Sequence, residues 1–366
     1  MTEPEALQQL DRTYVLFRKR KLIYFAGCDY FRLASHPGVI AAVDAGLKKF
    51  GLNVAASRLT TGNHALYAQL ERALCGFFDA ESALLTGNGY VTNLIVCQTL
   101  AGNFSHGLID ERAHPSLQDA ARFLDCPVLN FKHQDVADLQ RCLHRSGPGA
   151  KVLVMTDGMY SHDGSAAPLK EYRRILPRDG MMLVDDAHGA GVLGKTGKGA
   201  LEHAGIGRER IIQTITLSKA FGTYGGAIIG SESLRRAVLD RSRLFIGHTP
   251  LPLPLANASL CSVQLLKSDR RMRTRLQQNA AFVKKSLAGA RFAVPETPGP
   301  IVRIAPEGRG QTKKLERALL AAGIYPPFIH YPNGGESESG YFRFVISSEH
   351  TRAQLDKVAE VWKSAS

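Results

Sequence analysis

Short apolar runs and longer amphipathic stretches alternate along the middle of the chain. Between about residues 80 and 230 the apolar runs are three to seven residues long, and polar or glycine-containing segments separate them. Runs of this length without polar alternation are typical of strands that are buried on both faces. We expect seven such strands, at residues 83–86, 108–110, 128–131, 152–156, 181–185, 211–217 and 227–230.

Helical periodicity occupies most of the intervals between these runs. Two helices precede the first strand: one begins at Pro37 and ends before Gly51, and the other covers residues 64–78. Strands that alternate with helices predict an α/β fold with a mainly parallel sheet covered by helices. The other helices are expected at residues 91–100, 116–124, 136–143, 169–176 and 231–243.

A proline-rich stretch at residues 249–254 divides the chain. The sequence therefore predicts an N-terminal arm (1–35), a large domain (36–248) and a small α+β domain (249–366). Within the small domain we expect a long helical region to about residue 288, a strand at 300–304, a helix at 312–322, a glycine-rich loop at 334–340, a strand at 342–346 and a final helix.

The composition narrows the class of protein. Hydrophobic residues make up 44% and charged residues 22% of the 366 residues, which excludes a disordered or fibrous chain. No apolar run approaches the ~18 residues of a membrane span, so we expect a cytoplasmic protein without a signal peptide or a membrane partner. The six cysteines form no CxxC pair, which predicts reduced thiols and no zinc site.

The formal net charge is +13, which would suit binding to nucleic acid, to a membrane surface or to an anionic small substrate. The basic residues are dispersed, with clusters only at residues 18–21 and 270–275. Neither cluster is interleaved with aromatic residues in a nucleic-acid motif. We therefore interpret the charge as solvated surface and expect no nucleic-acid partner.

Residues 189–196 satisfy two nucleotide-binding patterns, GxGxxG and GxxxxGK[ST]. Both patterns need a strand directly before the loop and a helix directly after it, so that the helix N-terminus can hold phosphate. Here Asp186 to His188 separate the strand from the loop, and further glycines oppose a helix after it. Asp185, Asp186 and His188 are also suitable metal ligands, but no second cluster completes such a site. We expect neither a nucleotide nor a metal here.

A lysine and an aspartate follow two of the predicted strands. Lys219 stands just after the run 211–217, where burying an ammonium costs several kcal/mol unless its pKa shifts or it reacts. An amine of low pKa in a dry site is what Schiff-base chemistry requires, and Asp185 could keep a pyridinium nitrogen protonated. The hydroxyls of Thr216 and Ser218 could bind a phosphate. Taken alone, Lys219 can equally be a surface lysine.

The segments around these two residues extend into longer blocks. Residues 185–199 read DDAHGAGVLGKTGKG, and residues 216–226 read TLSKAFGTYGG. With these blocks the chain resembles the α-oxoamine synthase family of fold-type I pyridoxal 5′-phosphate (PLP) enzymes, whose patterns are DEAHGxGVxGxxGRG and TxSKAxGxxGG. Further matches occur in family order at residues 57–62, 70–71, 87–93, 110–116, 157–164 (DGMYSHDG for EGVFSMDG), 167–169 and 343–350.

The resemblance implies the fold and the cofactor contacts. It covers residues 23–250 well and implies a mainly parallel seven-stranded sheet between helices, with a smaller C-terminal α+β domain. Lys219 would form a Schiff base with PLP, Asp185 would pair with the pyridine nitrogen, and His114 would stack on the ring. Without the motif, His114 would be a loop or helix-capping histidine. The phosphate contacts implied are Gly89 and Tyr90, through backbone N–H groups, and Thr216.

Other implied contacts are to the phenolic oxygen of the cofactor and to the substrate. Ser161 and His188 would hydrogen-bond around the phenolic oxygen of the cofactor. Arg343 would bind the carboxylate of the amino acid, although without the motif it would be a surface arginine. Cys28 stands where the family has the asparagine that helps to hold that carboxylate, His162 replaces a methionine, and Phe328 replaces a threonine.

The reaction implied is a decarboxylative condensation of an amino acid with an acyl-CoA or acyl carrier protein thioester, which gives an α-amino ketone. The sequence does not select glycine, alanine or serine, nor the acyl chain. Another fold-type I enzyme, an aminotransferase or a retro-aldol lyase, stays open because a fold alone does not set the reaction. A basic binding protein without enzymatic activity also stays open.

The resemblance further implies a homodimer in which a hydroxyl of the partner completes each phosphate site. Thr249 is the candidate hydroxyl, and its alternative role is to cap the helix that follows. A two-fold interface would also cover the apolar side chains of Leu251, Leu253 and Leu255.

Overall fold

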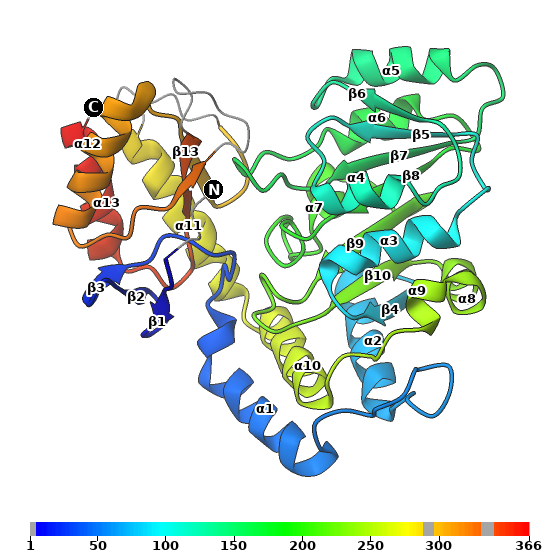
Figure 1. The fold of residues 1–366 in the computed structure, drawn as a ribbon, viewed down its shortest axis with the longest axis horizontal. Coiled ribbons are helices and arrows are strands. Elements are labelled where there is room, and N and C mark those ends of the chain that lie inside the picture. The colour runs from blue at the N-terminus through cyan, green and yellow to red at the C-terminus, as the bar shows by residue number, and fades with distance from the viewer. Residues whose placement is uncertain (1–4, 288–295, 331–339, 366) are drawn as a thin grey trace. The chain divides into compact units, whose positions relative to one another are not determined.

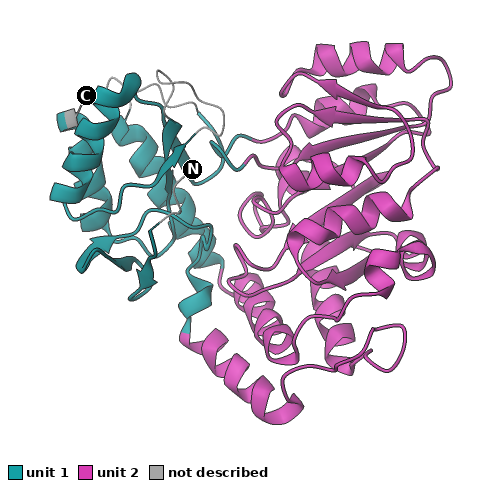
Figure 2. Cartoon of the chain, in the orientation of Figure 1, with its two compact units in different colours: residues 1–36, 161–165, 270–366 teal, residues 37–160, 166–269 magenta. Residues whose placement is uncertain are grey.

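The computed structural model describes residues 5–287, 296–330 and 340–365. The chain forms two compact units (Figure 2): a large unit of residues 37–160 and 166–269, and a small unit of residues 1–36, 161–165 and 270–366. Of the expected loop at 334–340, residues 334–339 lie outside the described residues.

A seven-stranded sheet runs through the large unit (Figure 1). Its order is β4–β10–β9–β8–β7–β5–β6, and β10 alone runs antiparallel to its neighbours. The predicted fold class is confirmed, and each predicted strand is found within two residues of its expected ends. The strands are β4 (Ser82–Thr86), β5 (His106–Asp110), β6 (Val128–Phe131), β7 (Val152–Asp157), β8 (Met181–Asp185), β9 (Ile211–Thr216) and β10 (Gly226–Gly230).

Helices cover both faces of this sheet. Alternate strand residues face opposite sides, so that Leu153 and Leu183 join one core and Val154 and Val184 the other. The first core includes α3 (Gly89–Thr99), α4 (Pro115–Ala121), α8 (Glu232–Arg241) and α9 (Arg243–Ile246). The second includes α5 (Val136–Arg145), α6 (Leu169–Ile175) and α7 (Ala200–Ala204).

Helix α10 (Leu253–Ser268) belongs to the large unit, which therefore extends beyond residue 248, where we expected the domain boundary. It packs against α1 (Pro37–Phe50) and α2 (Ala65–Phe78). The amide of Asn257 donates to the carbonyl of Ala42 at 2.7 Å, and Gly46 permits the close approach, since a Cβ there would lie 2.9 Å from that of Asn257. The prolines before α10 thus begin a packed helix instead of a linker.

The segment before α10 also differs from two expectations. Leu251 and Leu253 are 2% exposed within this chain, so their burial requires no partner. The N-cap of α10 is Pro252. Thr249 therefore does not cap this helix, and its side chain is exposed.

The small unit combines both ends of the chain. One of its three-stranded antiparallel sheets has the order β11 (Ile301–Ile304), β13 (Gly340–Val345) and β12 (Phe328–His330), and another has the order β1 (Gln8–Gln9), β2 (Tyr14–Phe17) and β3 (Arg20–Ile23). Ile23 and Phe25 of the N-terminal arm share one core with Trp362 and Phe344, so the arm is part of this unit. Its other elements are a 3₁₀ turn (Leu33–Ser35), α11 (Arg270–Leu287), α12 (Gly308–Ala321) and α13 (Arg352–Ala365). None of the helices in the described residues has the length and apolar character to cross a membrane.

Candidate functional site

Lys219 lies against a histidine from a neighbouring strand's loop. Its Nζ is 2.8 Å from Nε2 of His188. Lys219 follows β9 and His188 follows β8, and these strands are parallel neighbours. Both loops therefore leave the carboxyl edge of the sheet, where open α/β sheets bind their ligands.

Asp185, the last residue of β8, is 6% exposed and accepts two hydrogen bonds. Asn93 Nδ2 donates to it at 2.7 Å and the N–H of Ala187 at 3.0 Å, and Ser116 Oγ lies 3.4 Å from it. The hydroxyl of Thr214 donates to Oδ1 of Asn93 at 2.7 Å, which orients the amide toward the carboxylate. The carboxylate is thus fixed in place by β9, α3 and α4.

His114 is the N-cap of α4, and its Nδ1 accepts the N–H of Ser116 at 3.2 Å. Burial lowers the pKa of His114, and the charge of Lys219 lowers it further, while Asp185 acts in the opposite direction. The ring is therefore neutral at pH 7, and because Nδ1 is an acceptor, Nε2 carries the proton. The capping role expected without the motif is real, and it also fixes the ring beside Asp185.

The N-terminus of α3 lies against the end of β9. Asn88 caps α3 by accepting the N–H of Val91 at 2.9 Å. A Cβ at Gly89 would lie 2.8 Å from Cβ of Thr216, whose hydroxyl is 2.7 Å from that of Ser218. Backbone N–H groups and two hydroxyls thus meet at one point, an arrangement that suits an anion. The neighbouring Tyr90 is 44% exposed, and its hydroxyl bonds Asp119.

The two expected substrate contacts, Arg343 and Cys28, lie in the small unit with Ser161, an expected cofactor contact. Arg343 Nη2 is 3.4 Å from Sγ of Cys28, and its Nε donates to the carbonyl of Ser161. The buried Tyr30 also hydrogen-bonds Cys28. The structure thus groups Arg343, Cys28 and Ser161 within one unit.

Comparisons with known proteins assign the chain to a family. The family model for aminotransferase class I and II matches residues 20–361. The chain belongs to this family. An 8-amino-7-oxononanoate synthase of Thioalkalivibrio sulfidiphilus is 36% identical over 348 residues, which cover 93% of this chain and 87% of the relative. The synthase of Methylococcus capsulatus is 34% identical over 351 residues, covering 94% and 89%.

Similar solved structures place the chain in a smaller group within this family. A serine palmitoyltransferase from S. paucimobilis with a bound PLP–myriocin aldimine has a TM-score of 0.92 and 29% identity, covering 100% of this chain and 93% of that one. An 8-amino-7-oxononanoate synthase from Francisella tularensis has a TM-score of 0.80 and 26% identity, covering 94% and 97%. The chain is therefore an α-oxoamine synthase, an enzyme of a PLP-dependent family, as the sequence blocks predicted.

Several residues that hold the site of this α-oxoamine synthase received no role from the sequence. Asn93 and Ser116 stand inside matched blocks, but the blocks do not say that both bind Asp185. Asp110 accepts His133 Nδ1 at 3.0 Å and the hydroxyl of Tyr160 at 2.7 Å, and it anchors the segment that leads to His114. Burial raises the pKa of Asp110, but these hydrogen bonds outweigh burial and lower it.

In the glycine-rich loop of the synthase and directly after it, backbone N–H groups donate to carboxylates of the chain itself. Asp186 accepts the N–H of Ala200 at 2.8 Å and Nε2 of Gln213 at 2.6 Å. Glu202 accepts the N–H groups of Thr196 and Lys198. The helix after the loop, α7, has only five residues. Within the described ranges no group of three or more His, Cys, Asp or Glu residues could hold a metal ion.

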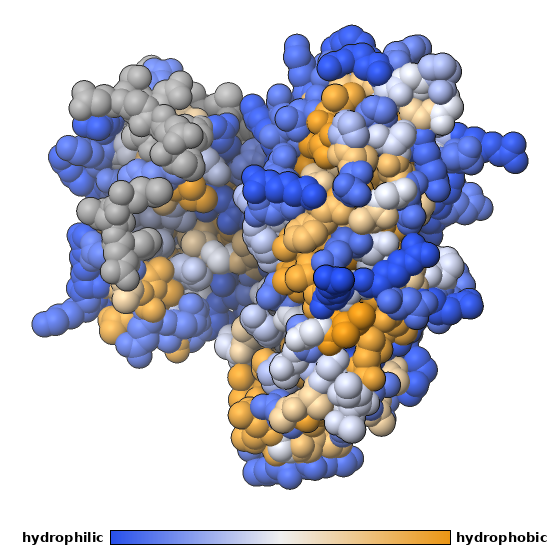
Figure 3. Space-filling view, turned by 45° about the vertical axis from the view of Figure 1, so that its right-hand side comes forward, coloured by the Kyte–Doolittle hydropathy of each residue, from blue (hydrophilic) through white to orange (hydrophobic). Residues whose placement is uncertain are grey.

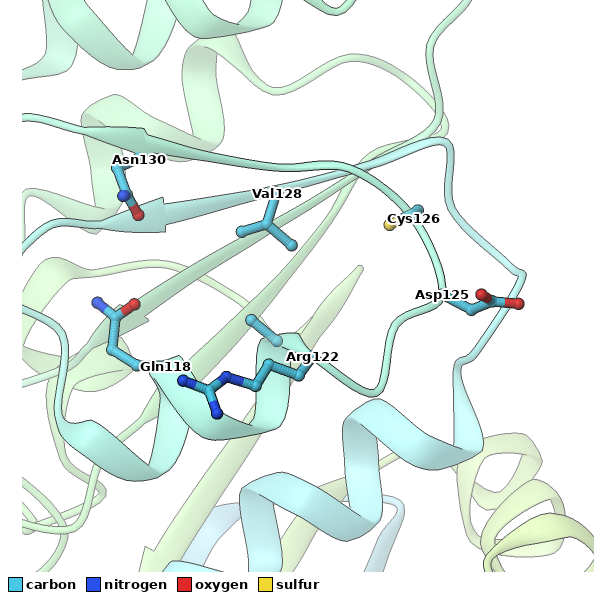
Figure 4. Close-up of a pocket in the computed structure, with 7 residues that line it drawn as sticks. Gln118, Arg122, Asp125, Cys126, Val128 and Asn130 are labelled. Atoms are coloured by element: carbon cyan, nitrogen blue, oxygen red, sulfur yellow. The ribbon is translucent and has the colours of Figure 1, made fainter.

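A separate pocket lies at the edge strand β6 (Figure 4). It has a volume of about 450 Å³, and it contains none of the residues described above. Its walls come from α4, from β6 and from the turn between them, and they include Gln118, Arg122, Cys126 and Asn130.

Proposed function

We propose that this chain is a PLP-dependent synthase that condenses an amino acid with an acyl thioester, as the 8-amino-7-oxononanoate synthases of biotin biosynthesis do. The amino acid and the thioester give an α-amino ketone, CO2 and the free thiol. The observation that carries the proposal is the grouping of Lys219, His188 and Asp185 on adjacent strand ends with the neutral ring of His114. The names of the curated relatives support it.

The residues present fit the cofactor. A buried carboxylate, Asp185, suits a protonated pyridine nitrogen, and a neutral imidazole suits the face of an aromatic ring. Gly89 leaves room that a Cβ would fill, next to the hydroxyl of Thr216. This cradle at the N-terminus of α3 suits a phosphate group.

When bound, PLP supplies an aldehyde that captures amines and a ring that withdraws electrons. Lys219 provides the amine and moves the proton at Cα of the amino acid. His188 holds Nζ of Lys219 by a hydrogen bond at 2.8 Å. Asp185 keeps the ring nitrogen protonated, and Arg343 binds the carboxylate of the substrate by its planar, charged fork.

We also propose a homodimer in which Thr249 reaches the phosphate site of the partner. Helix α1 exposes Ile40 and Leu47, and the segment after it exposes Leu52 and Leu59. Figure 3 shows apolar surface at the lower end of the large unit, the end where α1 lies in Figure 1. A second copy is the simplest cover for this surface, since two-fold dimers are the commonest assemblies.

The test compares two lysine variants. Lys219→Ala should lose the visible absorbance of the lysine-bound cofactor, its borohydride-reducible attachment and turnover. Lys195→Ala removes the exposed lysine of the GxxxxGK[ST] pattern and should keep all three. A Lys219→Ala enzyme with near wild-type turnover would contradict the proposal.

Products decide between the possible reactions. Purified enzyme is incubated with glycine, alanine or serine and a panel of acyl-CoA and acyl carrier protein thioesters, and CO2 and free thiol are measured. Equal amounts of both support the condensation. Amino-group transfer to an oxo acid without a thioester would instead establish an aminotransferase.

A further inference from the structure

A second aspartate stands beside Asp185 at the carboxyl edge of the sheet. Asp157 ends β7, Asp185 ends β8, and the two are register partners in this parallel pair. Paired residues of parallel strands project from the same face, about 5 Å apart. Both are 6% exposed. Two carboxyl groups this close cannot both be charged without a large cost.

The hydrogen-bond donors are divided unequally between them. Asp185 has two, from Asn93 and Ala187, and Ser116 Oγ lies 3.4 Å from it. In the described part of the chain Asp157 has one, the backbone N–H of His114, which lies 3.0 Å from its Oδ2. Two donors stabilise a negative charge better than one. The geometry therefore places the charge on Asp185 and the proton on Asp157.

The charged groups around Asp157 agree with this assignment. Burial raises the pKa of Asp157 well above its ordinary value, and Asp185 and Asp110 raise it further. The N–H of His114 and the charge of Lys219 act in the opposite direction. The direction of this shift agrees with a proton on Asp157.

The contacts of Asp157 form a closed ring. Its Oδ2 holds the backbone of His114, the hydroxyl of Ser116 donates to Nδ1 of His114 at 2.8 Å, and the same Oγ lies 3.4 Å from Asp185 on the adjacent strand. We propose that Asp157 is a positioning residue which, as a neutral acid, holds the backbone of His114 and leaves the carboxylate charge of this pair on Asp185. The proposal extends the proposed function and assigns a role to a position where the family's block has glutamate.

Infrared spectroscopy of the cofactor-free protein tests the proton directly. The carbonyl stretch of a protonated carboxylic acid should be present in the wild type at pH 7 and lost in the difference spectrum with Asp157→Asn. The matched control is Asp110→Asn, which removes a buried but ionised carboxylate and should leave this band. If Asp157→Asn leaves the band unchanged, the neutral acid is excluded.

Titration with PLP tests the positioning role. Asp157→Asn keeps an oxygen acceptor for His114 without a charge, so its dissociation constant for PLP should stay within about twofold of the wild type. Asp157→Ala orphans the N–H of His114 and should weaken binding by about tenfold. Equal affinities of Asp157→Ala and wild type would overturn the role. If the wild-type protein itself does not bind PLP, the proposed function fails, and the infrared result still decides the protonation of Asp157.

Discussion

Residues from three other elements hold Asp185 in position. A substitution can therefore remove its charge without unfolding the protein. Asp185→Asn is nearly the same size and can keep the contacts to Ser116 and Ala187. We expect the variant to fold and bind PLP but to lose about 10²-fold or more in kcat, as when a positioned electrostatic group is removed. Steady-state kinetics beside a PLP titration checks this. A rate close to that of the wild type would show that the carboxylate does not act on the ring nitrogen.

His350 makes the protein sensitive to acid. It is 4% exposed, its Nδ1 accepts the N–H of Ser347 at 2.9 Å, and burial lowers its pKa from 6.5 to about 3. Between these values the unfolded chain binds a proton that the folded chain does not, so stability falls as the pH drops below 6.5. At pH 5 this loss amounts to about 2 kcal/mol relative to pH 7.

Urea unfolding at pH 7 and pH 5 measures this effect. His350→Gln removes the titrating group, so its unfolding free energy should change less between the two pH values than that of the wild type. An identical change in both proteins would contradict the assignment.

At the scale of single residues, the sequence pointed to residues with unusual chemistry. It did not point to the residues that hold them in place. Lys219 and Asp185 stand out because a charged group directly after an apolar run requires an explanation. Asn93 is an ordinary helix residue in the sequence, and only the approach of α3 to β8 gives it a function. Residues that support another side chain can be identified only in the folded structure, where segments far apart in the sequence are neighbours.

Among the elements, α3 begins at a glycine whose place a larger residue cannot take without a clash. A methyl group at Gly89 would collide with Thr216 and fill the space above the first turn. Gly89→Ala should therefore weaken PLP binding by at least about tenfold, or about 1.4 kcal/mol, without unfolding the protein. Fluorescence titration and thermal melting check the two parts. Gly310→Ala, in open space within α12, is the matched control: it should leave the PLP affinity unchanged and should not lower the melting temperature, because alanine favours a helix over glycine.

The elements themselves were largely predictable, because buried strands and capped helices depend on local sequence. The helix that begins at Pro37 ends at Phe50, before Gly51, as expected. The error concerns α10, whose prolines indicated a linker. What decides its place is the contact of Asn257 and Gly46 with α1, more than 200 residues away along the chain. Such long-range packing has no local signature.

At the scale of the whole molecule, a shared active site can be tested by complementation. Lys219→Ala and Thr249→Arg should each be inactive, the second because a bulky cation replaces the exposed hydroxyl that we expect at the partner's phosphate site. After the two proteins are unfolded and refolded together, random pairing should restore about a quarter of the wild-type activity per site, since half of the dimers contain one intact site. Failure to regain activity, with mixed dimers verified by mass, would exclude the shared site.

The arrangement of the small unit has a consequence for the order of synthesis. Residues 1–36 leave the ribosome first, but the core that buries Ile23 and Phe25 is built from residues beyond 270. The large unit is continuous in sequence except for residues 161–165, so it can fold while translation continues. Throughout that time the arm must wait with its apolar side chains uncovered. A chain that stops before α13 would keep them exposed, and so incomplete copies of this enzyme should be preferred clients of chaperones and proteases.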